Sequence, residues 1–177
     1  MNEILKYDSE FVESKFITYV NNVFIQIHMA IVTKQLENIR HFVSQSVYEM
    51  LEKKVNTLDE KHLIQMYDEI NVAETKILNY AVEDNKIVIK LNIISRYIDY
   101  LIDESGNYVS GNMSSRIQKN NYLTFTKSIN CQQAKNVNRC PGCGASIDVN
   151  ASGKCPYCGT IYNLQDTNWI LSEIQIN

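Results

Sequence analysis

The chain has 177 residues, 45% of them hydrophobic and 21% charged, with a formal net charge of -3 and a pI near 5.6. This composition is typical of a globular protein with one core and a small appendage, and its acidic balance argues against nucleic-acid binding, which needs clustered Lys and Arg. The first ten residues are polar and unlike a secretory signal. The most apolar stretch, residues 16–32, is interrupted by Asn21, Asn22, Gln26 and His28, so no membrane span is expected.

The first third of the chain has the hydrophobic spacing of helices. Apolar residues recur every three or four positions over residues 12–31, which predicts an amphipathic helix of about 24 residues with Ser9 as its cap. The same spacing returns over residues 36–43 and 47–55, on either side of an interruption at residues 44–46. These two segments are predicted to form two shorter helices.

From residue 69 the pattern changes to that of strands. Strands are predicted near residues 69–83, 87–102 and 116–129, and the short polar turns between them favour antiparallel hairpins. The apolar set of the second strand changes phase, which predicts a bulge or bend between Ile93 and Ser95. Helices followed by a bent antiparallel sheet indicate an α+β fold.

Two copies of a cysteine-containing pentapeptide follow the third strand. They read Cys-Pro-Gly-Cys-Gly at residues 140–144 and Cys-Pro-Tyr-Cys-Gly at residues 155–159. Two thiolates three positions apart converge on one metal ion, so Cys140, Cys143, Cys155 and Cys158 are predicted to hold one structural zinc ion in a closed tetrahedral site. The alternative is a pair of disulfides or unlinked buried thiols. The fifth cysteine, Cys131, is interpreted as a free or partly buried thiol.

The cysteine-rich segment has the composition of a separate module. Both prolines and four of the six glycines lie within residues 141–159. The segment that follows, residues 167–176, is strand-like and too apolar for a free tail. We therefore expect an α+β domain made of residues 1–131 and 164–177, interrupted by a zinc ribbon at residues 132–163.

This arrangement resembles the Tim44-like family, named for a peripheral subunit of the mitochondrial inner-membrane protein translocase. The resemblance implies the nuclear-transport-factor-two-like or cystatin-like fold, in which N-terminal helices pack on a strongly bent, cone-shaped antiparallel sheet. In particular, the chain resembles bacterial members that have a zinc ribbon placed before the last strand. The stretches that carry the likeness are residues 16–34, 36–51, 93–112, 122–127 and 169–174.

The resemblance also implies a role in tethering or protein transport, through a protein partner or an anionic membrane surface. Because no catalytic constellation is present, we interpret the chain as a non-enzymatic binding module, cytoplasmic, with peripheral membrane contact left open. The alternative is a carrier or enzyme that uses an apolar pocket inside the cone, with Asp99 and His28 as candidates; both residues also fit structural roles. Nucleic-acid binding by the ribbon is disfavoured, because its charges and the zinc site sum to zero.

Overall fold

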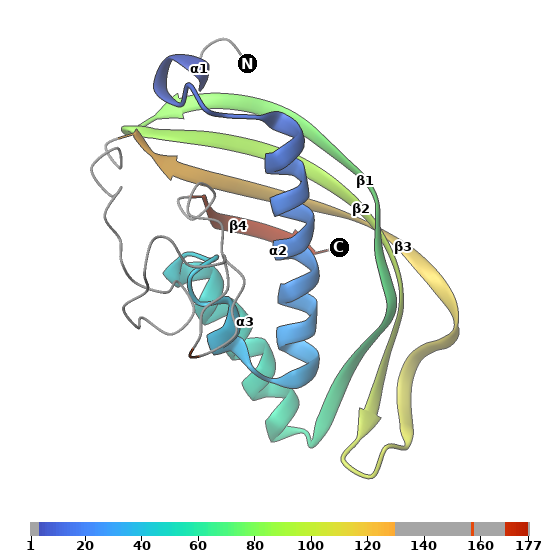
Figure 1. Ribbon diagram of the computed structural model, residues 1–177. Helices are drawn as coiled ribbons and strands as arrows, with labels where there is room; N and C mark the ends of the chain where they lie inside the picture. The colour runs from blue at the N-terminus through green and yellow to red at the C-terminus, as the bar shows by residue number, and fades with distance from the viewer. Residues whose placement is uncertain (1–3, 130–156, 158–168, 177) are drawn as a thin grey trace.

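The computed structural model describes residues 4–129, Tyr157 and residues 169–176. Helices lie against the concave face of a bent, open, four-stranded antiparallel sheet with the strand order β1-β2-β3-β4 (Figure 1). The α+β fold predicted from the sequence is thereby confirmed. The elements are α1 (Ile4–Tyr7), α2 (Glu13–Thr33), the 3-10 helix η1 (Leu36–Ile39), α3 (Gln45–Glu60), β1 (Leu63–Glu83), β2 (Lys86–Asp103), β3 (Tyr108–Ser128) and β4 (Ile170–Ile176).

The helix boundaries differ from the predicted ones in two places. Ser9 does not cap α2, because the Phe11 amide donates to the Asp8 carbonyl (3.2 Å) in a turn, and the helix begins only after the extended residue Val12. The segment at residues 36–43 forms only the short η1. The interruption at residues 44–46 is the start of α3, where the Ser44 side chain accepts a hydrogen bond from the Val47 amide (3.3 Å).

Both predicted hairpin turns are present, but two strands begin earlier than expected. β1 begins at Leu63 and β3 at Tyr108. Residues 63–68 of β1 are buried or half-buried but do not alternate apolar with polar residues, and the first part of β3 is largely polar and exposed, so neither part shows the alternation that marks a half-buried strand in a sequence. A register shift does lie at the position predicted for a bulge near Ile93 to Ser95, because Val72 pairs with Ser95 and Glu74 with Ile94, but the extra residue belongs to β1 and not to β2. Alternate residues of β2 from 87 to 97 stay buried in one phase, and its register with β3 shifts only after Tyr97.

The apparent phase change arose because β2 carries apolar residues on both faces. Ile94 and Ile98 are half-buried on the opposite side from Ile93. The register shifts between β1 and β2 follow Asp68, Val72 and Ile77, all of them on β1. Bulges increase the local twist and bend a strand, so these shifts contribute to the curvature of the sheet.

The segment after the cysteine-rich stretch returns to the core, as expected. β4 pairs antiparallel with β3, and buried Trp169 packs its ring 4.8 Å from that of Phe16. The ring of Phe125 on β3 meets Phe16 edge-on at 5.8 Å. The predicted domain boundaries, near residues 131 and 164, lie outside the described residues.

Helix α2 is long and apolar enough to span a membrane by length and composition, which differs from the expectation drawn from the sequence. Its apolar face is the one that contacts the sheet. A core helix satisfies the same length and composition test, and the burial of α2 is that of a core helix. Its buried residues are Phe16, Val20, Val23, Phe24, Ile27, His28, Ala30 and Ile31.

Candidate functional site

The predicted zinc ligands lie outside the part of the chain that the structure describes. This applies to Cys140, Cys143, Cys155 and Cys158, and also to Cys131. Within the described residues, no group of three or more His, Cys, Asp or Glu side chains is arranged to hold a metal ion. The zinc ribbon therefore stays a prediction, and the candidate sites below belong to the α+β domain.

His28 lies at the centre of a buried aromatic cluster. It is fully buried on α2, and its Nδ1 is 2.9 Å from the Phe24 carbonyl oxygen. Because a carbonyl only accepts, Nδ1 carries the proton, and Nε2 presents a lone pair that has no partner among the described residues. The imidazole packs against the rings of Tyr67 (4.8 Å) and Tyr97 (5.5 Å). Burial lowers the pKa of His28 to about 4, so the ring is neutral near pH 7.

Charged groups from other elements surround the same cluster. Lys54 of α3 donates to the Tyr67 hydroxyl (2.9 Å), and burial lowers the pKa of Lys54 while nearby Asp99 opposes that shift. Burial, followed by the charge of Asp99, raises the pKa of Tyr67. The Asp99 carboxylate accepts a hydrogen bond from Gln65 (2.8 Å). Asp99 is thus held by a residue of β1, which fits the structural role that the sequence also allowed for it.

The structure places both His28 and Asp99 next to Tyr67, but it fills the space around His28 with rings. Aromatic packing of this kind fixes α2 against β1 and β2, which is a structural role. The two hollows described below are lined by other residues. The geometry of His28 therefore fits a packed core histidine better than a general base waiting for a substrate.

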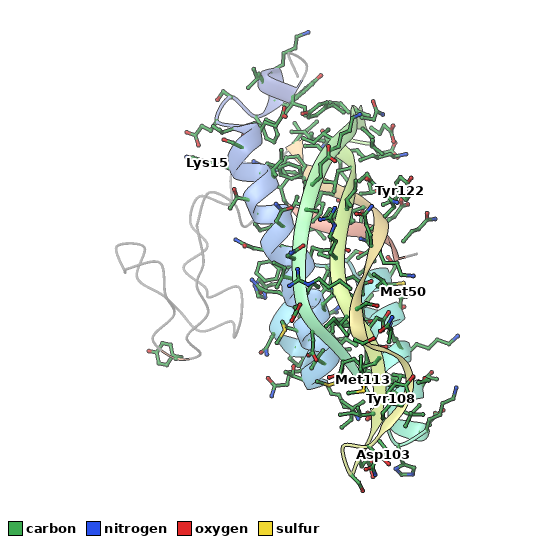
Figure 2. All side chains as sticks on the ribbon, turned by 90° about the vertical axis from the view of Figure 1, so that its right-hand side faces the viewer. Lys15, Met50, Asp103, Tyr108, Met113 and Tyr122 are labelled. Atoms are coloured by element: carbon green, nitrogen blue, oxygen red, sulfur yellow. The ribbon has the colours of Figure 1, made fainter. Side chains whose placement is uncertain are left out.

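The larger hollow, of about 590 Å³, crosses the outer face of the sheet and reaches the first turns of α3. Three of its apolar side chains are strongly exposed: Met50 (44%), Leu78 (51%) and Tyr122 (46%). Figure 2 shows Met50 and Tyr122 at the margin of the sheet that β4 forms. The lining residues are Ser46, Val47, Met50, Leu78, Lys90, Leu91, Tyr122, Leu123, Thr124, Ser172, Glu173, Ile174 and Gln175.

The charge of this hollow is balanced. Among the described lining residues, Lys90 and Glu173 provide one basic and one acidic side chain. The Glu173 carboxylate accepts a hydrogen bond from the Thr124 hydroxyl (3.0 Å). Sequence reasoning missed this site because Met50, Leu78 and Tyr122 come from a helix and two strands that are far apart along the chain.

A second hollow near the N-terminus is much smaller, about 60 Å³. Phe11 and Trp169 line it, and the ion pair of Lys127 with Asp8 (2.6 Å) borders it. A water molecule occupies about 30 Å³ of liquid volume, so this hollow has room for water rather than for a ligand. The larger hollow is the better candidate for a binding site.

A family model described as the Tim44-like domain matches residues 1–136 of the 177. The chain belongs to the Tim44-like domain family. This Tim44-like domain is also similar to the crystal structure of the intermembrane space region of the chloroplast protein ARC6, with a TM-score of 0.48 and 7% sequence identity, over 90% of this chain and 94% of that one. No curated protein matches the chain.

The family match covers the Tim44-like domain from α1 through β3 and stops before β4. The larger hollow therefore combines residues inside the match, such as Met50 and Tyr122, with residues beyond it, such as Glu173 and Ile174. The closing strand thus completes a surface that the matched part alone does not contain.

Proposed function

We propose that this Tim44-like domain is a non-enzymatic binding or tethering module with a protein-transport-like role, and that its partner is another protein. The observation that carries the proposal is the hollow beside β4, where Met50, Leu78 and Tyr122 expose apolar surface. Aromatic and Met side chains are enriched where proteins bind one another. Family membership supports the same role.

The shape and charge of the hollow fit a protein better than a small molecule or a nucleic acid. It is shallow and crosses all four strands, whereas small-molecule sites are concave and bury most of the ligand. Its single Lys and single Glu provide no basic surface for phosphates. We also propose that the domain is cytoplasmic and makes peripheral contact with a membrane. Binding to anionic lipid vesicles tests the membrane contact.

The alternative function is a carrier or enzyme that uses an apolar pocket inside the domain. The unpartnered Nε2 of His28 favours it, because a buried acceptor could receive a hydrogen bond from a ligand. The rings of Tyr67 and Tyr97 pack against His28 and argue against it. A ligand that entered this cluster would change the fluorescence of the tyrosines and the chemical shifts of the His28 ring.

Capture of partners by the full chain tests the protein-binding proposal. We expect Met50→Glu to weaken recovery of the partner from native lysate by about tenfold or more, because it places an unpaired charge in the hollow. The matched control is Met113→Glu, since Met113 is similarly exposed (52%) but does not line the hollow. Quantitative mass spectrometry of cross-linked eluates measures the effect. Absence of any reproducible partner for the unmodified chain would refute the proposal.

We also propose that Cys140, Cys143, Cys155 and Cys158 hold one structural zinc ion in a ribbon inserted before β4. Two cysteine pairs with this spacing provide the four soft thiolate donors that a closed zinc site uses. The bound metal would tie the two pentapeptides together and leave no position open for a reacting water. Its role would be to fold the ribbon, because metal binding of this kind contributes folding free energy.

Elemental analysis tests the zinc proposal. The chain purified without chelators is expected to contain about one zinc ion, and Cys143→Ser is expected to lose most of it because a structural site needs all four ligands. Cys131→Ser is the control and should keep its zinc. Metal-free wild-type protein, or equal loss in the control, would contradict the assignment.

A further inference from the structure

The edge of β4 that faces away from β3 is only partly paired. At its start, the Leu171 amide donates to the Phe42 carbonyl (2.9 Å) and the Leu171 carbonyl accepts from the Ser44 amide (2.9 Å). These bonds form a parallel bridge between Val43 and Leu171. After Leu171, the Ser44 hydroxyl donates to the Ser172 carbonyl (3.3 Å), and no backbone group within residues 4–129 bonds to the rest of this edge. Among the described residues, the edge beside residues 173–175 is therefore open for a fifth strand.

The opposite edge of the sheet is protected against strand pairing. β1 contains three register shifts, and charged Glu69, Glu74 and Lys76 are exposed along it. Its side chains also bond to α2, where the Tyr80 hydroxyl donates to Glu13 (2.7 Å). Bulges and charges are the means by which natural sheets prevent a further strand from adding to an edge.

β4 has few of these protective features. A single register shift separates it from β3, next to Thr124, and Glu173 is its one charged side chain. The hollow lies alongside this edge, with Ser46 and Met50 of α3 on one side and Tyr122 of β3 on the other. An open backbone edge therefore coincides with the larger of the two hollows described above.

We propose that the partner contributes an extended segment that pairs with β4 beyond Leu171 and places an apolar side chain between Met50 and Tyr122. This proposal rests on the protein-binding function and specifies the form of the partner. The segment would continue the strand position that Val43 already occupies, so the fold itself shows one short example of the pairing. In such strand addition, backbone hydrogen bonds supply affinity and alternate side chains supply specificity.

The surroundings define the chemistry of the segment. Alternate side chains of a strand point to opposite faces, so every second residue would face the hollow. Because Lys90 and Glu173 balance each other, an uncharged apolar residue fits there better than an ion. Proline is excluded at positions whose amide must donate to β4.

Selection of peptides on the full chain tests the proposal. The probe is a phage-displayed library of random peptides of about twelve residues, long enough to span β4 at roughly 3.3 Å per residue. Enriched peptides are then resynthesised with one backbone amide methylated at a time. Methylation at every second residue should weaken binding by about tenfold or more, while the intervening positions should tolerate it. Hydrogen exchange should show slower exchange of β4 amides when the peptide is bound.

The outcomes separate this proposal from the broader function. Loss of peptide binding in Met50→Glu but not in Met113→Glu, together with the alternating methylation pattern, supports strand addition. Peptides that bind without alternation, that bind Met50→Glu equally well, or that are never enriched overturn it. Partner capture by the unmodified chain would still uphold the binding function in those cases, whereas failed capture would remove the function itself.

Discussion

Replacement of Gly111 by alanine is expected to lower the free energy of unfolding by about 3 kcal/mol or more. Gly111 lies on β3 with a φ of 104°, a conformation that residues with a side chain rarely adopt. An added Cβ would lie 2.5 Å from the Asp99 carbonyl oxygen and 2.6 Å from the Tyr100 Cα. Both obstacles are backbone atoms of the neighbouring strand, so relief of the clash must separate β2 from β3.

Gly106 provides the matched control for this substitution. It also has a positive φ of 83°, but a Cβ there would meet no atom within 4 Å. Gly106→Ala should therefore cost only the conformational penalty, about 1 kcal/mol. Urea unfolding of the three chains measures both values. Equal costs for the two substitutions would show that the close approach of the strands at Gly111 is not rigid.

His28 is expected to make the domain sensitive to acid. Its pKa is about 4 in the folded chain because of burial, compared with 6.5 for an unperturbed histidine. Between pH values of about 6.5 and about 4, His28 is protonated in the unfolded chain but neutral in the folded chain. The free energy of unfolding therefore decreases as the pH falls through this range. The full loss from this one residue is about 3 kcal/mol at 1.36 kcal/mol per pKa unit.

His28→Phe removes the titrating group and keeps a ring of similar shape among Phe24, Tyr67 and Tyr97. We expect the wild type to lose more stability than this variant between about pH 7 and about pH 4.5, by about 2 kcal/mol. Burial also lowers the pKa of His41 to about 4. This half-buried residue is present in both chains and lowers the stability of each by a smaller amount as the pH falls. Urea unfolding at the two pH values measures the difference. If wild type and variant lost equal stability between the two pH values, this result would count against a neutral, buried His28.

Local patterns predicted the features of the fold that depend on neighbouring residues. Helical spacing identified α2 and α3, and polar turns identified both hairpins of the sheet. The apolar character of residues 167–176 correctly indicated a final strand that returns to the domain. The start of β1 was missed because its apolar residues do not alternate with polar ones, and the start of β3 was missed because it is largely polar and exposed.

The candidate sites depend on contacts between distant segments, and the sequence contained less information about them. His28 and Asp99 were recognised as ionisable residues in apolar surroundings, but nothing local indicated that Lys54 and Tyr67 would join the same cluster. Met50 of α3 and Tyr122 of β3 come together only because α3 lies beside β4, which pairs with β3 at Tyr122. The length of a strand and the packing of a helix beside it are set by tertiary structure.

The position of β4 in the chain has a consequence for biosynthesis. Phe16 on α2 and Phe125 on β3 leave the ribosome well before Trp169, the ring that covers them in the finished domain. During that interval a nascent chain exposes an aromatic surface that cannot yet be closed, and such surfaces attract chaperones or other nascent chains. The time needed to translate residues 126–168 thus determines how long the nascent chain can aggregate through this surface.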